Sequence, residues 1–271
     1  MICSLLAASC VLAISAGGAP DPPRLALERR FADLLGTDDG CFVLHDVRRD
    51  RTLRVNPVQC RRRLPPCSTF KIFNSLAGLQ SGVLKDENTR FAWDGAPQPF
   101  PAWERDHTLA TAVRDSVVLY FQRVAAGVGE KAMQRYLDAA GYGNRDISGG
   151  LTRFWLGSSL RVSPDEQVVF LRRLYRGDLP FDQRHIDVVK KVLVQEEAGG
   201  VVFSGKTGTC EAGDGSRVGW FVGRQASPAA DYVFATTVVG QSLPERPRGA
   251  GADGLRAREI SRALLAELAA P

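Results

Sequence analysis

The sequence is poor in the side chains that usually bind metal ions. Only three histidines and six cysteines occur among its 271 residues, and no two cysteines are spaced as Cys-x-x-Cys. Structural zinc sites are built from several such side chains at close spacing, and no cluster of this kind is present. We therefore expect no bound metal.

The sequence also lacks a basic segment interleaved with aromatic residues. Its net charge is +5, but the arginines are scattered in short groups such as Arg61-Arg62-Arg63 and Arg172-Arg173. Binding of single-stranded nucleic acid requires a basic groove with aromatic side chains on which bases stack. We interpret the charge as a solvated surface with some attraction for anionic small molecules, and we expect no nucleic-acid partner.

Long apolar runs are missing except at the N-terminus. Apolar residues run from Leu5 to Ile14 and small residues follow, which is typical of a signal peptide and too short to cross a bilayer. We predict that residues 1–18 are removed and that residues 19–271 form one soluble domain in the periplasm, without a stable membrane anchor. Cys10 is a weaker match to a lipoprotein attachment site.

Export changes the interpretation of the cysteines. Two of the six precede the predicted cleavage site, and the four that remain are Cys41, Cys60, Cys67 and Cys210. An even number of cysteines in an oxidising compartment predicts two disulfides. Four cysteines allow three pairings, and the spacing alone does not choose among them.

Secondary-structure signals divide the chain into three parts. Five segments alternate as strands do: 41–47, 52–56, 201–206, 218–223 and 232–239. Helical periodicity dominates from about residue 86 to residue 194 and returns at 255–269. Within the first of these stretches, Ser163-Pro164-Asp165-Glu166 predicts a helix that begins with a capping box and has proline at its first position. We predict an α+β fold, in which an antiparallel β-sheet flanked by helices carries an inserted all-helical subdomain. An active site is expected between the sheet and the insertion.

The most informative local feature is Ser68-Thr69-Phe70-Lys71, which follows two prolines. The residue before a proline is held extended, and the apolar residues after Phe70 have helical spacing, so Ser68 is predicted at a helix N-terminus. Lys71 lies one turn further on the same face, within reach of the serine oxygen, and could activate it as a nucleophile. The alternative is a plain N-cap serine beside a solvated lysine, which is the commoner meaning of an isolated Ser-x-x-Lys.

Three further motifs follow in order, each weak when taken alone. They are Ser116-Val117-Val118, then Tyr142-Gly143-Asn144 with Phe154-Trp155-Leu156, and finally Lys206-Thr207-Gly208-Thr209. By themselves they would indicate a helix cap, a turn, a core tryptophan and a chance triplet. Together with the first motif they match the signature of the serine penicillin-recognising enzymes. The middle motif departs from the Ser-Asp-Asn form, and the set resembles the class D β-lactamases (oxacillinases) from about Cys41 to the C-terminal helix.

The resemblance implies the β-lactamase/transpeptidase-like fold and hydrolysis of β-lactam antibiotics through an acyl-enzyme on Ser68, with antibiotic resistance as the result. Backbone N–H groups of Ser68 and Thr209 would form the oxyanion hole. Lys71 would react with carbon dioxide to give N6-carboxylysine and serve as general base, so bicarbonate is the only cofactor implied. Val118 would shelter this group, and the Trp155 indole N–H would donate to it.

The resemblance also assigns residues to the substrate. Ser116 would relay a proton to the departing ring nitrogen, and Lys206 and Thr207 would face the substrate carboxylate. Three further residues are assigned to substrate binding: Gly208, Tyr142 and Leu156.

Two assignments in the predicted cleft are less determined by the motifs. An arginine near the last helix is expected to bind the substrate carboxylate bidentately. We assign Arg256 in preference to Arg258, although counting back from Ile260 places Ala257 at this position. Phe100 is assigned to an apolar wall of the cleft, with a loop anchor as the alternative.

The same resemblance bears on the disulfides and on rival functions. Class A carbapenemases carry a disulfide in a matching arrangement, and the catalytic motifs must bring Ser68 and Thr209 together, so we predict Cys67–Cys210 and, by difference, Cys41–Cys60. An exported penicillin-binding transpeptidase or a β-lactam sensor domain would share the fold and form a long-lived acyl adduct. The motifs determine neither the oligomeric state nor the substrate range, including activity on carbapenems.

Overall fold

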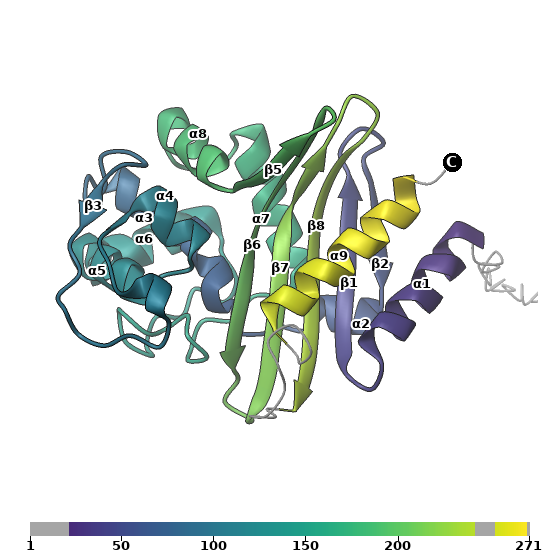
Figure 1. Cartoon of the computed structure of the whole chain (residues 1–271), viewed down its shortest axis with the longest axis horizontal. Coiled ribbons are helices and arrows are strands. Elements are labelled where there is room, and N and C mark those ends of the chain that lie inside the picture. The colour runs from purple at the N-terminus through teal and green to yellow at the C-terminus, as the bar shows by residue number, and fades with distance from the viewer. Residues whose placement is uncertain (1–21, 242–252, 270–271) are drawn as a thin grey trace, which may run out of the picture.

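Both ends of the chain build one antiparallel sheet. The structure is a computed structural model that describes residues 22–241 and 253–269, so the predicted signal peptide lies outside the described residues. The six strands lie in the order β2-β1-β8-β7-β6-β5 (Figure 1). Their bounds are β1 Asp39–Asp46, β2 Arg51–Val55, β5 Val194–Ala198, β6 Val201–Glu211, β7 Ser216–Ala226 and β8 Asp231–Gln241. The predicted hairpin is β1–β2, and the three later strands are each longer than predicted.

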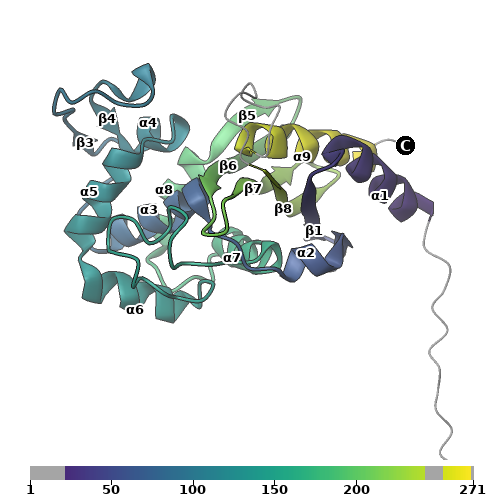
Figure 2. The ribbon, with the colours of Figure 1, turned by 90° about the horizontal axis from the view of Figure 1, so that it is seen from below.

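Helices cover both faces of this sheet. On one face lie α1 (Pro22–Leu35) and α9 (Gly254–Ala269), and on the other lies α7 (Pro164–Arg176) (Figures 1 and 2). The central strands β1 and β8 are buried almost throughout because both of their faces are covered. This burial removes apolar area from water on two sides of the sheet and explains the nearly continuous apolar runs in these strands.

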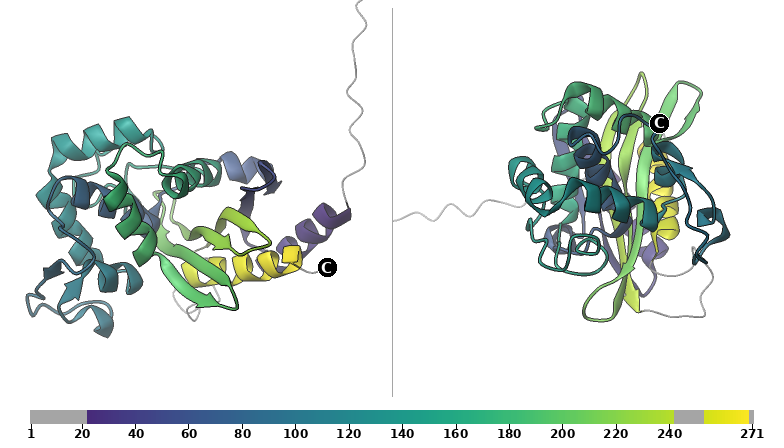
Figure 3. Two further views of the ribbon diagram at one scale, coloured as in Figure 1. Left: turned by 90° about the horizontal axis from the view of Figure 1, so that it is seen from above. Right: turned by 90° about the vertical axis from the view of Figure 1, so that its left-hand side faces the viewer.

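The remaining helices form a second body beside the sheet, which faces the viewer in the right-hand view of Figure 3. Its helices are α3 Lys71–Gln80, α4 Leu109–Arg114, α5 Val118–Val128, α6 Glu130–Ala140 and α8 Gln183–Val192. The chain passes from the sheet to the helical body through α2 Pro57–Arg61 and the 3₁₀ turn η1 Cys67–Phe70, whereas the 3₁₀ turn η2 Pro101–Trp103 lies within the inserted segment. The sheet and the helical body together give the predicted α+β fold.

The inserted segment differs from the prediction in two respects. It is not wholly helical, because β3 (Arg90–Phe91) pairs with β4 (His107–Thr108) as a separate two-stranded ribbon. In addition, α7 leaves the helical body and packs on β8 and β1. Its N-terminus has the predicted capping box, in which the Ser163 hydroxyl accepts from the Glu166 N–H and the Glu166 carboxylate accepts from the Ser163 N–H.

Both predicted disulfides are confirmed. Cys41 in β1 is bonded to Cys60 in α2, with Cα atoms 5.2 Å apart. Cys67 in η1 is bonded to Cys210 in β6, with Cα atoms 5.6 Å apart. Both distances lie in the range usual for disulfides. The second bond joins the turn that carries Ser68 to the strand that carries Lys206.

Candidate active site

The Ser68–Lys71 pair lies where η1 passes into α3. Neither element has a side-chain N-cap, so the Ser68 hydroxyl does not cap the helix. The Lys71 Nζ atom lies 2.7 Å from Ser68 Oγ, and the Lys71 side chain is completely buried. The geometry therefore excludes the plain N-cap and the solvated lysine, and leaves a serine hydroxyl in hydrogen-bond contact with an amine.

The surroundings of Lys71 favour its neutral form. Burial lowers the pKa of Lys71 well below its ordinary value, and the nearby positive charge of Lys206 lowers it further. The Lys71 Nζ atom lies over the Phe121 ring, 5.6 Å from its centroid. Among the described residues, no carboxylate forms an ion pair with Lys71. A neutral amine beside a serine is the form that can accept a proton.

Ser116 and Lys206 form a second hydrogen-bonded pair close to Lys71. Ser116 lies just before α5 with φ of +58°, a left-handed conformation that is uncommon for a serine. The residue at the N-cap of α5 is Val117, and no side chain caps that helix. The Lys206 Nζ atom donates to Ser116 Oγ at 2.9 Å and to the Thr207 carbonyl at 3.1 Å. Burial lowers the pKa of Lys206 to about 7, so its ammonium and amine forms coexist near neutral pH.

The edge of β6 approaches the catalytic turn closely. Strand β5 pairs with β6 only over Val201–Ser204, which leaves the later part of β6 unpaired on that side within the described sheet. A side chain at Gly208 would place its Cβ 3.1 Å from the Pro66 carbonyl oxygen and 3.2 Å from the Thr69 nitrogen. The lack of a side chain therefore permits β6 to lie against η1 and brings Thr209 next to the Ser68 turn.

Trp155 is fully buried beside the catalytic helix. Its ring stacks on Phe70, the residue before Lys71, with centroids 5.4 Å apart. Among the residues that the structure describes, none is a hydrogen-bond partner of the indole Nε1 atom. Because a buried unpartnered donor is costly, this N–H is available to an acceptor that the unmodified chain does not provide. Val118 and Leu156 are each half-buried in the same region.

Tyr142 does not line the cleft, so its assignment to substrate binding is corrected. It is 2% exposed and packs edge-on against Phe70 and Phe170. Burial raises the pKa of its hydroxyl. The sequence Tyr-Gly-Asn indicates a turn, and the tyrosine of that turn is directed inward because the aromatic cluster around Phe70 offers it apolar area to bury.

Arg256 also does not reach the cleft, which corrects a second assignment. Its guanidinium forms an ion pair with Asp38 and donates to the carbonyls of Leu34 at 3.0 Å and Leu35 at 2.6 Å. The last carbonyls of a helix have no partners within it, so the C-terminus of α1 attracts this cation. Arg258 pairs with the neighbouring Glu259, and Ala257 is fully buried.

Phe100 is anchored near the Ser116 loop. Its ring lies 4.8 Å from the ring of Trp103, and the Trp103 indole donates to the Asp115 carbonyl at 2.9 Å. This arrangement connects the η2 turn to the residue before Ser116. Both the wall and the anchor interpretation of Phe100 remain compatible with this position.

Two supporting residues were not predicted from the sequence. Gln167 of α7 is fully buried and donates from Nε2 to Thr69 Oγ1 at 2.9 Å, within the catalytic motif itself. Trp220 of β7 donates from Nε1 to the Pro65 carbonyl at 2.8 Å. Neither is marked by a local pattern, because each acts on the Ser68 turn from an element far away in the sequence.

The fold and the site define a serine enzyme of the penicillin-recognising type. A family model described as the penicillin-binding protein transpeptidase domain matches residues 40–266. The Bacillus subtilis protein named "Probable beta-lactamase YbxI" is 44% identical over 200 residues, which is 74% of either chain. The regulatory protein BlaR1 of Bacillus licheniformis is 32% identical over 253 residues, covering 88% of this chain and 42% of BlaR1.

Solved structures agree with these relatives. The crystal structure of the class D β-lactamase YbXI from Nostoc superposes with a TM-score of 0.82 at 32% identity, covering 90% of this chain and 99% of that one. The chain belongs to the class D β-lactamase family.

Proposed function

We propose that the protein hydrolyses β-lactam antibiotics through an acyl-enzyme on Ser68 and thereby gives resistance to them. The observation that carries this proposal is the 2.7 Å contact between Ser68 Oγ and the buried Lys71 amine. Ser68 gives its hydroxyl proton to the base at Lys71, and the Ser68 oxygen bonds to the lactam carbonyl carbon. The carbon–nitrogen bond of the ring then breaks, and water later releases the acid and restores Ser68.

Lys71 fits the carbon dioxide adduct implied by the family. A neutral amine is the form that bonds to carbon dioxide, losing a proton as the carbamate forms, and burial keeps Lys71 neutral. The unpartnered Trp155 N–H supplies a donor suited to an anionic oxygen. When formed, the carbamate supplies an oxygen base for both acylation and deacylation. No additional deacylating carboxylate is then required.

The Ser116–Lys206 pair serves the leaving nitrogen and the substrate carboxylate. Ser116 accepts from Lys206 Nζ at 2.9 Å, so its own hydroxyl proton is free to pass to the departing ring nitrogen. Lys206 in its ammonium form, with the half-buried Thr207, attracts the substrate carboxylate. Because Arg256 is bound to α1, this attraction does not depend on it.

Two backbone N–H groups are proposed to stabilise the oxyanion. They belong to Ser68 in η1 and to Thr209 in the part of β6 that β5 does not border. The Cys67–Cys210 bond and the close approach at Gly208 hold these two segments together. Fixed donors need no reorganisation as charge develops on the carbonyl oxygen, which is the main source of rate in such sites.

We also propose that the protein acts after export to the periplasm. Two disulfides require an oxidising compartment to form and persist. No helix in the described part of the chain is long and apolar enough to span a membrane.

The proposal is tested by measuring the lifetime of the acyl-enzyme formed with a penicillin. Intact-mass spectrometry monitors the adduct over time, with and without added bicarbonate. We expect a short-lived adduct at Ser68 and faster turnover when bicarbonate is added. A ¹³C NMR resonance from ¹³C-bicarbonate bound at Lys71, absent in Lys71→Ala, would accompany it. A stable adduct that is indifferent to bicarbonate would contradict hydrolase function.

A β-lactam sensor is the second candidate, because BlaR1 aligns with 88% of this chain. A sensor forms the same bond at Ser68 but deacylates slowly, so the same lifetime measurement decides between the two functions. We favour the hydrolase because the buried Trp155 donor is positioned beside the catalytic helix to stabilise a persistent base.

A further inference from the structure

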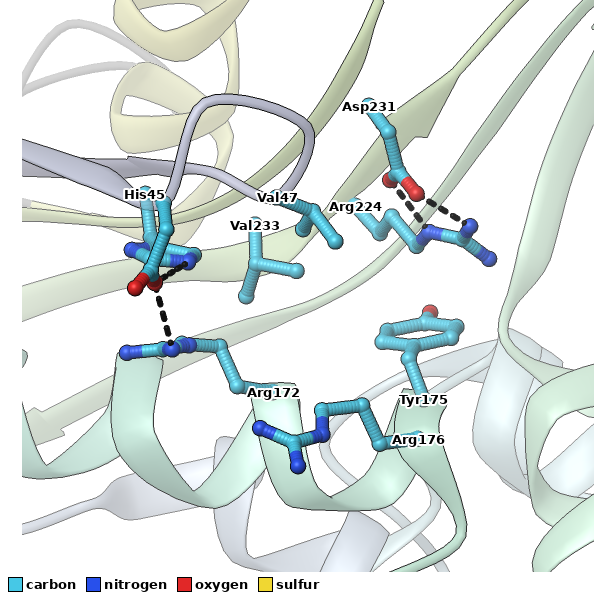
Figure 4. Close-up of a pocket in the computed structure, with 9 residues that line it drawn as sticks. His45, Val47, Arg172, Tyr175, Arg176, Arg224, Asp231 and Val233 are labelled. Atoms are coloured by element: carbon cyan, nitrogen blue, oxygen red, sulfur yellow. Dashed lines mark hydrogen bonds and ion pairs between the residues drawn. The ribbon is translucent and has the colours of Figure 1, made fainter.

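A pocket that shares no residue with the catalytic cleft lies between α7 and the sheet. Its volume is about 460 Å³, which is enough for a small organic molecule. Figure 4 shows its walls: the end of β1 and the following turn, the C-terminal half of α7, and neighbouring positions of β7 and β8. The cluster Ser68, Lys71, Ser116 and Lys206 contributes nothing to these walls.

Three arginines from two elements face this pocket. Arg172 and Arg176 lie one turn apart on α7, and Arg224 comes from β7 (Figure 4). Like charges four residues apart on a helix repel each other, so this pair destabilises α7 unless anions lie nearby. The arrangement is therefore suited to a ligand with negative charge.

The three guanidinium groups are not equally available. Arg224 is held by Asp231 through two hydrogen bonds of 2.7 Å each and lies over the Tyr175 ring at 4.8 Å. It forms a rigid wall. Within the described part of the chain, Arg172 forms one ion pair, with Asp50 at 3.2 Å, and the Asp50 side chain is 83% exposed.

Arg176 is likewise available, because it pairs with the exposed Asp178 at 2.9 Å. Exposed pairs of this kind contribute little to stability and are readily exchanged. Arg172 and Arg176 can therefore turn toward a bound anion without loss of a buried interaction.

The space between the charged ends is apolar. Val47 and Val233 lie between His45 on one side and Arg224 on the other, and the Tyr175 ring stands below Arg224 (Figure 4). The His45 side chain is almost completely buried, and its Nδ1 atom is hydrogen-bonded to the Thr52 hydroxyl at 3.0 Å. The pocket thus combines an apolar centre with the guanidinium groups of Arg172 and Arg176, whose carboxylate partners are exposed.

We propose that this pocket is a second binding site, for a compact aromatic carboxylate. A guanidinium binds a carboxylate with two parallel hydrogen bonds, and the valines and Tyr175 accept a flat apolar body. Each of the three guanidinium groups has one carboxylate partner: Asp50 for Arg172, Asp178 for Arg176 and Asp231 for Arg224. A ligand with one carboxylate can replace the exposed Asp50 or Asp178, and the near-neutral charge balance disfavours polyanions such as nucleotide phosphates.

The test is a titration of the ¹⁵N-labelled protein with benzoate, followed by NMR shifts. We expect saturable shifts at the amides of residues 172–176 and at the Arg224 side chain, whether or not signals near Lys206 also move. Benzamide has the same shape without the charge and is expected to bind at least tenfold more weakly. Shifts confined to the catalytic cleft, or equal binding of benzamide, would overturn the proposal.

Variants separate this pocket from general attraction to a basic surface. The double variant R172A/R176A is expected to weaken benzoate binding at the pocket at least tenfold. The matched control R29A/R30A removes two exposed arginines from α1, on the other face of the sheet, and is expected to bind as the parent does. If the double variant fails to fold, R176A alone loses only an exposed pair and is expected to weaken binding severalfold. Unchanged affinity in the folded R172A/R176A, or in R176A when it stands in for the double variant, would refute the site.

Discussion

At the residue scale, the proposed catalytic pair Ser68 and Lys71 departs from the usual roles of these residues. Ser68 does not cap a helix and Lys71 is not solvated, although both are the usual roles of these residues in a Ser-x-x-Lys sequence. Burial makes the amine a base, and proximity makes the hydroxyl its partner. The chemistry follows from the environment of the pair and not from the residue types alone.

Ser116 combines a left-handed backbone with a hydroxyl that faces Lys206. Ser116→Ala and Ser116→Gly both remove the proposed proton relay, so each is expected to lower kcat by about 10²-fold or more. Only glycine adopts positive φ without steric cost, so Ser116→Gly is expected to be more stable than Ser116→Ala by about 1 kcal/mol. Steady-state kinetics and urea unfolding measure the two effects separately. If Ser116→Gly is the more stable variant but keeps the kcat of the parent, the Ser116 hydroxyl does not act in the mechanism.

The sequence predicted the positions of some site residues but not the directions of others. The motifs located Ser68, Lys71, Ser116 and Lys206, which the structure brings into two hydrogen-bonded pairs. They could not orient Tyr142 or Arg256. The direction of a side chain depends on neighbours supplied by distant segments, here the aromatic cluster around Phe70 and the C-terminus of α1.

At the element scale, the site depends on how η1 is held against β6. The contacts that do this are the Cys67–Cys210 bond, the bare backbone at Gly208 and the Trp220 hydrogen bond to Pro65. A displacement of about 1 Å in such a site lowers the rate by about 10²-fold. These contacts are therefore expected to affect catalysis as well as stability.

The two disulfides provide a matched pair of variants. C41A/C60A and C67A/C210A each remove one bond, and each is expected to lower the unfolding free energy by about 2–5 kcal/mol. Only the second bond flanks Ser68 and Thr209. C67A/C210A is therefore expected to lower kcat at least tenfold at a temperature where both variants are folded, whereas C41A/C60A retains the parent kcat. Equal kcat values for the two variants would show that Cys67–Cys210 serves stability alone.

Elements far from the site were predicted with mixed success. The alternation in β1 and β2 and the capping box of α7 are local signals, and both were confirmed. Strand β5 (sequence VQEEA) was not predicted because it is exposed along its whole length and has no apolar alternation. It pairs with β6 as a hairpin closed by the two-residue turn Gly199-Gly200, in which both glycines have positive φ, so the local signal lies in the turn and not in apolar alternation.

At the scale of the whole molecule, buried lysines make stability depend on pH. Burial lowers the pKa of Lys206 from 10.5 to about 7, so between these values the unfolded chain binds more protons than the folded one. The unfolding free energy is then expected to rise with pH over this window, by up to about 1.4 kcal/mol per pH unit from this group.

Lys206→Met tests this linkage. The variant has no proton to lose at this position, so its unfolding free energy is expected to rise less steeply between pH 7 and pH 9.5 than that of the parent. Urea unfolding at several pH values measures the slope. If the slopes are the same, the pKa of Lys206 is not lowered by burial. The same variant is expected to lose activity, because Lys206 contacts Ser116.

The central claim is that Lys71 carries a carbamate, stabilised by the Trp155 indole, that drives deacylation. Trp155→Phe removes the unpartnered N–H and leaves the apolar ring. A hydrogen bond to a charged group contributes about 1.5–3 kcal/mol, which corresponds to a loss of at least about tenfold in carbamate stability. Intact-mass spectrometry after mixing with a penicillin measures the adduct directly. We predict a transient adduct on the parent protein and one at least tenfold longer-lived on Trp155→Phe, shortened again by bicarbonate. Equal lifetimes with and without the indole would contradict the account.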